Sequence, residues 1–252
     1  MPVNSNRPRL SAIIITKNEV KDLPACLASL AFCDEIVVVD SGSTDGTLEI
    51  AERVASRVIV RADWAGFGRQ KQRALDAATG DWVLSIDADE VIPPELALEI
   101  RTAIESETHV GYRLNRLNAF LGKFMHSGGW TPDRPLRVVR RDAARFSEDV
   151  VHEILIVDGT IGDLPTPMPH LSYRDFDEVL DKLRRYALAG AEQRRNSGRG
   201  GSVGKAIIRS ITTFLKLYIG KRGFLDGQHG FVAAVASSQE IFWRYLAAGW
   251  NR

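Results

Sequence analysis

Trp82-Val-Leu-Ser-Ile-Asp87-Ala-Asp89-Glu90 is an apolar run that ends in two aspartates separated by one residue. Such a run is typical of a buried strand in an α/β sheet, and these sheets bind ligands where their strands end. In an extended chain Asp87 and Asp89 point the same way. Two neighbouring carboxylates repel each other unless a cation or a bound hydroxyl lies between them, and a divalent metal holding a diphosphate meets both needs. The alternative is a helix cap, because Pro93-Pro94 favours a helix start shortly afterwards.

Short apolar runs alternate with helical patterns before this stretch. The apolar, β-branched runs cover residues 10–16, 35–40 and 57–60. Helical patterns follow them at about 22–30, 48–55 and 69–78. Strands that alternate with helices at this spacing predict an α/β fold with a parallel, doubly wound sheet.

Polar side chains end three of the predicted strands. In chain order they are Thr16, Asn18, Glu19, Asp40, Asp87 and Asp89. If the strands are neighbours, these groups converge on one crevice, which favours a nucleotide site because a sheet built only for stability does not need acids there. Neither a G-x-G-x-x-G fingerprint nor a G-x-x-x-x-G-K-[ST] loop follows the first strand. Their absence disfavours a nicotinamide dehydrogenase and a P-loop enzyme.

Four motifs, taken together, carry a family resemblance. They are Thr16-Lys-Asn-Glu19, Val39-Asp-Ser-Gly-Ser-Thr-Asp-Gly-Thr47, Gly80-Asp-Trp82 and Asp87-Ala-Asp-Glu90. In order and spacing they resemble the successive motifs of family-2 glycosyltransferases, which are inverting enzymes of the GT-A fold that use nucleotide-diphosphate sugars. The resemblance implies a Rossmann-like, mixed and mainly parallel sheet flanked by helices.

The same resemblance implies roles for individual residues. Candidates for nucleotide-sugar binding are Thr16, Asn18, Glu19, Asp40, Gly42 and Asp87. Among these, Asp40 is expected to contact the uracil or ribose, and Asp87 to lie near the ribose and the metal. Asp89 is expected to ligate Mg²⁺ or Mn²⁺. For Asp40 the alternative is a cap of the loop that follows it.

Basic residues on the helical pattern before Gly80 are further candidates for the diphosphate. Residues 69 and 73 share one helical face, and the alternative is a solvated basic face. We assign Arg69 to the solvated face and keep Lys71 and Arg73 as candidates for nucleotide-sugar binding.

An inverting transfer also needs a base for the acceptor hydroxyl. Family-2 enzymes commonly present this base in an acidic motif, and the chain offers two candidate segments, Glu148-Asp149 and Val151-His152-Glu153. We predict Glu153 as the base with His152 beside it, and rank Asp149 next.

Two further segments provide candidate ligands. Phe124-Met-His126-Ser-Gly-Gly-Trp130 is an aromatic, glycine-containing loop suited to a sugar, so His126 and Trp130 are candidates for acceptor binding. Downstream, three prolines within residues 165–169 predict an extended connector rather than a helix or a central strand. In many GT-A enzymes a downstream histidine completes the metal shell, and His170 is our candidate. For His126 and His170 a structural role is the alternative.

The C-terminal part is helical and locally basic. Between Asn196 and Leu225 there are six Lys or Arg residues and no acid, and the predicted helix at 205–219 is amphipathic. Such a helix is attracted to an anionic membrane surface, and the alternative is an ordinary helix that packs on the catalytic domain. We therefore predict a GT-A catalytic domain over 1–195, with a nucleotide-sugar half at about 8–106 and an acceptor half at about 107–195. Residues 196–252 are predicted to form a helical extension.

A more specific resemblance involves the second half of the chain. Val151-His-Glu153, Pro169-His-Leu-Ser-Tyr173 and Gly223-Phe-Leu-Asp-Gly227 are similar to the bacterial lipopolysaccharide core β-1,4-glucosyltransferase subgroup. This resemblance implies transfer of a hexose, typically glucose, from a UDP-sugar to a lipid-anchored oligosaccharide of the inner core, at the cytoplasmic face of the membrane.

Composition limits the other functions. The chain has 252 residues with 44% hydrophobic and 26% charged residues, as in a globular protein, and its net charge of +1 gives no reason to expect nucleic acid. Cys26 and Cys33 are expected to be reduced core residues. The N-terminus does not resemble a signal peptide, and no apolar run reaches the ~18 residues of a membrane span, so we expect a cytoplasmic protein with peripheral membrane contact.

Three alternatives remain beside a metal-dependent inverting hexosyltransferase. The first is an enzyme of the same fold acting on an exopolysaccharide, a lipid carrier or a protein. The second is a sugar nucleotidyltransferase, which needs a glycine-rich basic loop after the first strand that Lys17-Asn18-Glu19 does not supply. The third is a non-catalytic, membrane-associated binding module, against which the intact acidic motifs argue.

Overall fold

The computed structural model of the protein describes residues 7–147 and 154–250. These fold into two compact units. The first contains residues up to 116 together with 134–170, and the second contains 117–133 together with the chain from 171 onward. The chain passes between the units within strands β5 (Gly111–Phe120) and β10 (Ile161–Tyr173) and at residues 133–134.

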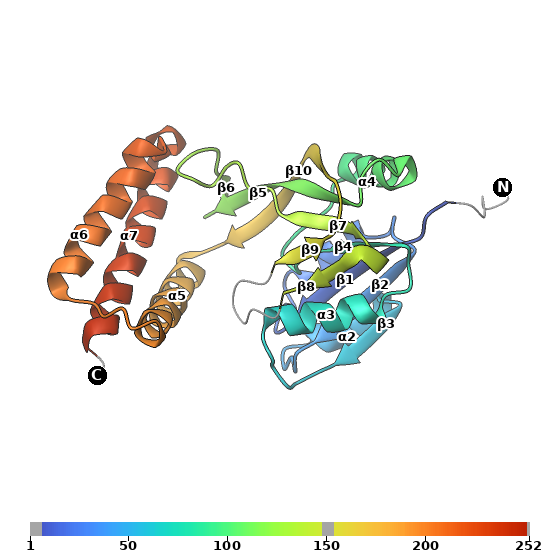
Figure 1. The fold of residues 1–252 in the computed structure, drawn as a ribbon, viewed down its shortest axis with the longest axis horizontal. Helices are drawn as coiled ribbons and strands as arrows, with labels where there is room; N and C mark the ends of the chain where they lie inside the picture. Colours follow the sequence, from blue (N-terminus) through green and yellow to red (C-terminus); the bar gives the residue numbers. More distant parts are fainter. Residues whose placement is uncertain (1–6, 148–153, 251–252) are drawn as a thin grey trace. The chain divides into compact units, whose positions relative to one another are not determined.

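A mixed, mainly parallel sheet forms the centre of the first unit (Figure 1). Its order is β10-β5-β7-β4-β1-β2-β3. The parallel strands are β1 (Leu10–Thr16), β2 (Glu35–Asp40), β3 (Arg57–Val60) and β4 (Trp82–Ser85). Strand β7 (Leu136–Arg140) is antiparallel to β4 and β5, and the short β6 (Lys123–Phe124) pairs with β5. The predicted fold class is thereby confirmed.

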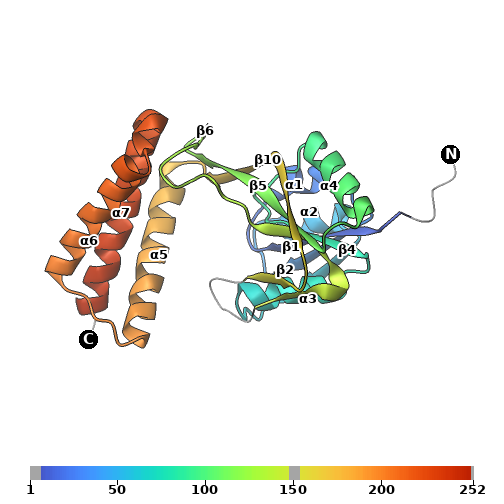
Figure 2. The same ribbon diagram turned by 45° about the horizontal axis from the view of Figure 1, so that its top comes forward.

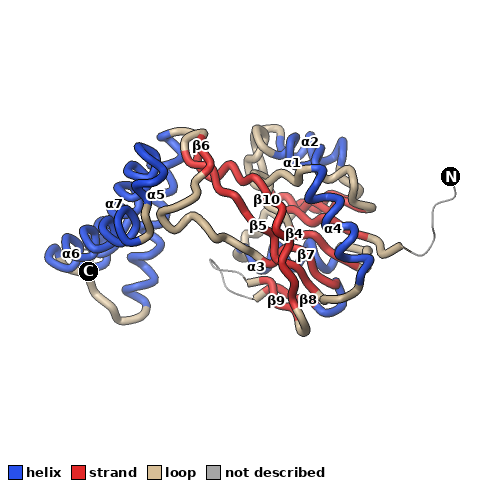
Figure 3. The backbone as a smooth tube through the Cα atoms, turned by 90° about the horizontal axis from the view of Figure 1, so that it is seen from above, coloured by secondary structure: helices blue, strands red, loops and turns tan. Residues whose placement is uncertain are grey.

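Helices cover both faces of this sheet. On one face lie α1 (Leu23–Ser29), α2 (Thr47–Val54) and α4 (Pro94–Ser106), whereas α3 (Phe67–Ala77) and the hairpin β8–β9 (Ala144–Phe146 and Leu155–Val157) lie on the other (Figures 2 and 3). Two apolar cores result. The first includes Leu27, Leu84 and Ile100, and the second includes Val39 and Leu75. Because alternate residues of a strand face opposite sides, a sheet covered on both faces needs continuous apolar runs, which is the pattern of β1, β2 and β4.

The Gly80-Asp81 motif has a structural explanation. A Cβ at Gly80 would lie 2.7 Å from the Ser11 hydroxyl and 2.8 Å from the Arg9 carbonyl, so no side chain fits there. The Asp81 carboxylate accepts the Arg9 backbone N–H at 2.8 Å. Together these contacts fix where β4 enters the sheet beside β1.

Three helices make up most of the second unit. Helix α7 (Gly227–Trp250) lies between α5 (Phe176–Asn196) and α6 (Val203–Leu215), as Figures 1 and 2 show. The chain extends α6 by one π-helical turn, η2 (Lys216–Gly220), and turns into α7 through η3 (Gly223–Asp226). Asp175 caps α5 by accepting the Glu178 N–H at 2.9 Å, and the glycine-containing segment 197–202 separates α5 from α6.

A buried carboxylate joins the start of α7 to the loop after β6. Asp226 is 4% exposed, and its carboxylate accepts the backbone N–H groups of His126 and Ser127 and the Ser127 hydroxyl, the last at 2.6 Å. The Lys123 ammonium donates to the Asp226 carbonyl at 2.7 Å. The Gly223–Gly227 motif therefore anchors the loop within this unit.

Several expectations are settled by these features. The proline-rich segment is extended, as predicted, but it is part of β10, a strand at the sheet edge, where missing N–H donors are tolerated. Cys26 and Cys33 are free thiols, and burial raises the pKa of the Cys33 thiol to about 12. Among the described helices none is both long and apolar enough to cross a membrane.

Candidate functional site

The carboxyl ends of β1 and β2 meet as the sequence predicts. Thr16 and Asp40 are register partners, and the Thr16 hydroxyl donates to the Asp40 carboxylate at 3.0 Å. The carboxylate also accepts the backbone N–H groups of Gly42 and Ser43, both at 2.9 Å. These two hydrogen bonds are the loop-capping contact considered above. Asp40 is also buried, at 1% exposure. Whether it also contacts a nucleotide stays a prediction.

The loops after these two strands are bound to each other. Asn18 has φ of 59°, and its side-chain oxygen accepts the Thr44 N–H at 2.8 Å, while its own N–H donates to Ser43. The Glu19 N–H donates to the Thr47 hydroxyl at 2.8 Å. Gly42 has φ of +83°, a conformation in which a side chain is strained. The polar residues of both motifs thus form one ordered rim at the carboxyl end of the sheet.

Asp87 lies between two cations. Its carboxylate is 3.0 Å from the Lys71 ammonium and 2.5 Å from the Arg137 guanidinium. Both cations are buried, each at 6% exposure. Burial alone would raise the pKa of Asp87, but the charges of Arg137 and Lys71 more than offset this and hold that pKa well below its ordinary value. Asp87 is therefore ionised at neutral pH.

Glu90 extends this cluster into the interior. It is fully buried and accepts from Arg137 at 2.5 Å, from Arg116 at 3.2 Å and from the Asp87 backbone N–H at 2.9 Å. An ionised carboxylate at such depth needs counter-ions. The two guanidinium groups supply them, so one network ties β4 to β5 and β7.

Asp89 has a different partner. Its carboxylate is 3.1 Å from the Nε2 atom of His170, which β10 brings beside the Asp87–Glu90 turn through a bridge between Glu90 and His170. Within residues 7–147 and 154–250, no group of three His, Cys, Asp or Glu side chains forms a metal site. A carboxylate and an imidazole next to each other are nevertheless suitable donors for a divalent ion whose other ligands come from a substrate diphosphate.

The structure corrects two expectations about the aspartates. Strand β4 ends at Ser85, and Asp87–Glu90 form a turn closed by a hydrogen bond from the Glu90 N–H to the Asp87 carbonyl at 3.1 Å. The argument that Asp87 and Asp89 point the same way along an extended chain is therefore wrong, and the two carboxylates contact separate partners. The helix-cap alternative is wrong as well, because the N-cap position of α4 is Pro93.

Other candidates lie elsewhere. The Arg73 guanidinium pairs with Asp63 at 2.5 Å and donates to Gln70, so it is not part of the Asp87 cluster. The proposed base Glu153 and its neighbours Asp149 and His152 lie outside the described residues. Their roles stay predictions.

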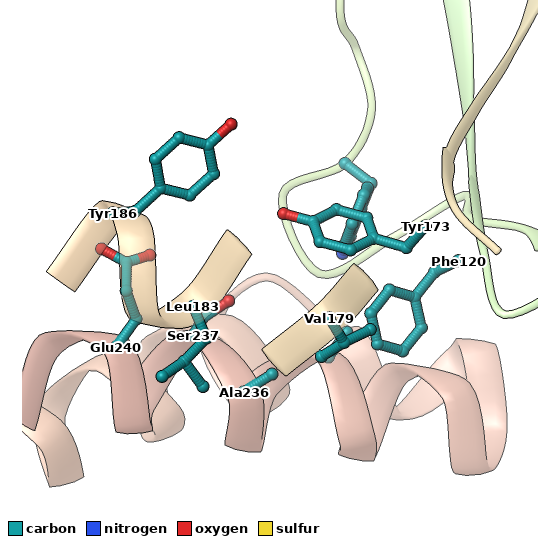
Figure 4. Close-up of a pocket in the computed structure, with 10 residues that line it drawn as sticks. Phe120, Tyr173, Val179, Leu183, Tyr186, Ala236, Ser237 and Glu240 are labelled. Atoms are coloured by element: carbon teal, nitrogen blue, oxygen red, sulfur yellow. The ribbon is translucent and has the colours of Figure 1, made fainter. Parts of the chain in front are cut away.

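The two acceptor candidates belong to the second unit. His126 is exposed, and its backbone N–H donates to Asp226 while its carbonyl accepts the Thr131 hydroxyl. Trp130 lines an open pocket together with Phe120, Tyr173 and residues of α5 and α7. In Figure 4 the Tyr173 hydroxyl points toward the side of the pocket where Tyr186 and Glu240 lie. Burial raises the pKa of Tyr173 to about 12, so this hydroxyl is a neutral donor.

Sequence reasoning missed Arg137, Arg116 and the inward role of Glu90. In β7, Arg137 lies between the apolar residues Leu136 and Val138, and an exposed strand also alternates charged and apolar residues in this way. Its partners lie 47 and 50 positions away along the chain. The available signal was an arginine flanked by apolar residues in the run 136–140, which the sheet places between β5 and β4.

Comparison with known proteins identifies the family. The model of glycosyl transferase family 2 matches residues 11–141, more than half of the chain. A lipopolysaccharide core biosynthesis glycosyltransferase, LpsC, from Rhizobium meliloti (strain 1021) is 33% identical over 94% of this chain and 93% of its own length. The chain belongs to glycosyl transferase family 2. This family-2 glycosyltransferase therefore uses nucleotide sugars, as its strand-end motifs predict.

Solved structures share its fold. The mannosyltransferase PcManGT from Pyrobaculum calidifontis, solved with GDP-Man and Mn²⁺, has a TM-score of 0.53 at 18% identity and covers 94% of this chain and 89% of its own. The 1–349 part of TarS from S. aureus, in complex with UDP-GlcNAc, has a TM-score of 0.50 at 17% identity, with 95% and 90% covered. At these identities the likeness is one of fold, and it confirms the GT-A architecture.

Proposed function

We propose that this family-2 glycosyltransferase transfers a hexose, with glucose as the expected sugar, from a UDP-sugar to a lipid-anchored oligosaccharide of the lipopolysaccharide core, with inversion at the anomeric carbon. The observation that carries the acceptor class is the 33% identity to the R. meliloti core biosynthesis transferase over nearly the full length of both chains. We place the reaction at the cytoplasmic face of the membrane.

The strand-end rim supports donor binding in this proposal. Thr16, Asp40 and Gly42 form an ordered, hydrogen-bonded edge, and the low pKa of Asp87 keeps its carboxylate able to accept from ribose hydroxyls. The Lys71 and Arg137 cations that flank Asp87 cancel its charge, which lowers its repulsion of a diphosphate.

Asp89 and His170 are the proposed metal ligands. A bound Mg²⁺ or Mn²⁺ would supply stabilisation of the negative charge on the departing diphosphate. The protein positions the pair by a turn on one side and by β10 on the other, so the distance of 3.1 Å is set by two separate elements. Both Mg²⁺ and Mn²⁺ are proposed, and the His170 imidazole favours Mn²⁺, because nitrogen ligands suit Mn²⁺ better than Mg²⁺.

Glu153 is the proposed base. In the reaction the acceptor oxygen forms a bond to the anomeric carbon, the bond from that carbon to the diphosphate oxygen breaks, and the hydroxyl proton passes to the carboxylate. Nucleoside diphosphate leaves with the electron pair of the broken bond. We expect Glu153→Gln to lower kcat by at least about 100-fold with little change in donor affinity, because only proton removal is lost.

A donor screen tests the proposal. Calorimetry with UDP-glucose, UDP-N-acetylglucosamine and GDP-mannose, each with and without Mn²⁺, is expected to show metal-dependent binding of the uridine nucleotide. Incubation with UDP-glucose and truncated core oligosaccharides, followed by linkage analysis, identifies the product. Exclusive binding of GDP-mannose would contradict the proposed UDP-sugar donor. Transfer only to a non-core acceptor would contradict the proposed core acceptor. If no nucleotide sugar binds, both the donor and the acceptor assignments are contradicted.

A further inference from the structure

An exposed apolar face runs along α6 and its π-helical extension. The large aliphatic side chains on it are between 45% and 62% exposed, and their spacing places them on one side of the helix. They are Val203, Ile207, Ile208, Ile211, Leu215 and Ile219. We call these six residues the α6 apolar face. Water-soluble proteins rarely leave a contiguous aliphatic patch of this kind uncovered, so it indicates an interaction surface.

Other contacts of the same helix hold it against α7. Ala206 is fully buried, and α6 packs along α7, with Phe214 contacting Phe231 at a ring separation of 5.7 Å. Helix α6 therefore has a partner already, and the apolar face is additional to the surface that holds the helix in place. Ser202 caps the helix by accepting the Lys205 N–H at 3.3 Å, so the helix begins independently of any further ligand.

The charges beside this face have one sign. Lys205, Arg209 and Lys216 are exposed on α6 next to the aliphatic stripe, and none forms an ion pair with any residue in the described ranges. Residues 196–225 contain no acid at all. The first acid after them, Asp226, is buried and accepts four hydrogen bonds from His126 and Ser127. The helix thus combines a broad aliphatic stripe with unpaired cations.

We propose that the α6 apolar face binds an anionic phospholipid surface, with α6 lying parallel to the membrane. The aliphatic side chains enter the boundary between headgroups and acyl chains, and Lys205, Arg209 and Lys216 contact lipid phosphates. This deepens the proposed function, since it brings the enzyme to the surface in which a lipid-anchored acceptor lies, and in this sense it rests on that function.

Charge favours a membrane over a second copy of the chain. In a symmetric dimer the same patch faces itself, so the cations along its margin would approach each other. Like charges at an interface margin disfavour association, whereas anionic headgroups neutralise them. The exposed apolar residues of α5 provide a contrast. Leu180 and Leu188 are 57% and 49% exposed, but both acids and bases, such as Asp181 and Lys182, lie among them.

Sedimentation with vesicles tests the proposal on the full chain. We expect the protein to sediment with vesicles of equal parts phosphatidylcholine and phosphatidylglycerol at low salt, and much less with pure phosphatidylcholine or at high salt. Ile208→Ser combined with Ile211→Ser is expected to weaken binding to the anionic vesicles by at least about tenfold, because two large aliphatic groups are lost. Leu180→Ser combined with Leu188→Ser, equally exposed on α5, is the matched control and is expected to bind like the original chain.

Two results would overturn the proposal. One is equal vesicle binding by the α6 variant and the original chain when circular dichroism shows that both are folded. The other is a dimer in solution that the α6 variant converts to a monomer. Calorimetry of UDP-glucose binding separates this inference from the proposed function, since the α6 variant keeps donor binding in either case. A chain that binds vesicles but no nucleotide sugar contradicts the proposed function alone.

Discussion

Two aspartates of one motif have unlike surroundings, although one residue separates them in the sequence. Asp87 is neutralised by Lys71 and Arg137, whereas Asp89 contacts His170. The turn between them is what separates their partners, and an extended chain would have kept them together. Arg137 contacts both Asp87 and Glu90, which are the first and last residues of this turn.

Loss of Arg137 is therefore expected to be costly. Arg137→Gln leaves the buried Glu90 and the partly exposed Asp87 short of their shared counter-ion, so we expect the free energy of unfolding to fall by about 3–5 kcal/mol. Urea denaturation followed by circular dichroism measures this change. The control is Arg145→Gln, which removes an exposed ion pair to Asp158 in the β8–β9 hairpin and should cost less than about 1 kcal/mol. Equal losses in both variants would show that the buried network contributes no more than a surface pair.

Asp89 is expected to control metal binding. Asp89→Asn removes the charged donor next to His170, so the affinity for Mn²⁺ in the presence of UDP should fall at least about tenfold. Titration calorimetry measures this affinity, with Asp142→Asn, an exposed carboxylate outside the candidate site, as the control. Chelation of the metal should likewise abolish transfer, and Mn²⁺ should restore it. Undiminished affinity in the Asp89 variant would remove this residue from the metal site.

The sequence predicts the acids of this site but not their supports. Apolar runs ending in Thr16, Asp40 and Asp87 are local patterns, and the parallel sheet follows from their alternation with helices. The contacts of Arg137 with Asp87 and Glu90, and of His170 with Asp89, depend on how distant strands are placed beside β4. No local sequence pattern encodes which distant strands lie beside β4. His170 was predicted only by likeness to a family.

At the scale of elements, short connections hold the second unit together. The segment η3 places Asp226 at the start of α7, where the carboxylate receives the loop after β6. Sequence patterns predict a helical C-terminal part, with an amphipathic helix at 205–219 where α6 and η2 lie. They did not show that residues 117–133 join these helices, since that requires a contact between positions about one hundred apart, such as Ser127 and Asp226.

The Asp226 contact gives a prediction that depends on pH. Burial alone would raise the pKa of Asp226, but hydrogen bonds from Ser127 and the His126 N–H lower it below its ordinary value. A depressed pKa in the folded state means that the stabilisation is present above the unfolded-state pKa of about 3.9 and is lost as the pH falls through the folded value. We expect Asp226→Asn to destabilise the protein by about 1–2 kcal/mol above pH ~5, with the difference shrinking below pH ~4.

Thermal unfolding of both proteins across this pH range measures the difference. Ser127→Ala is a companion variant, because it removes one donor to the same carboxylate and keeps the backbone contacts. A difference between Asp226→Asn and the original chain that stays constant down to pH ~3 would mean that ionisation of Asp226 does not contribute.

At the scale of the whole molecule, the grouping of helices differs from the predicted division at residue 195. Helix α5 packs along α7 and buries Val179, Ala187 and Ala191. The three helices therefore form one packed group on both sides of the glycine-rich segment 197–202, although the patterns suggested an extension that begins there. Whether 196–252 behaves as a separate domain in solution stays a prediction that can be tested.

Limited proteolysis addresses this division. Arg199 is exposed in the segment between α5 and α6, so trypsin is expected to cut there first. Because α7 packs against both α5 and α6, the two fragments should stay together in size-exclusion chromatography under native conditions and separate in urea. Arg199→Gln is the control, and it should slow this cut without changing elution. Separate elution of the C-terminal fragment without denaturant would support a domain boundary at residue 195.

The distribution of tryptophans has a practical consequence. Trp82 is 1% exposed within the core of the first unit, and Trp130 contacts Phe120 and Tyr173 in the second. The other three, at positions 64, 243 and 250, are between 44% and 74% exposed. Indole fluorescence shifts to longer wavelength when water reaches the ring, so the two enclosed rings dominate any spectral change on unfolding. With the exposed three replaced by phenylalanine, each unit of this glycosyltransferase carries its own optical reporter.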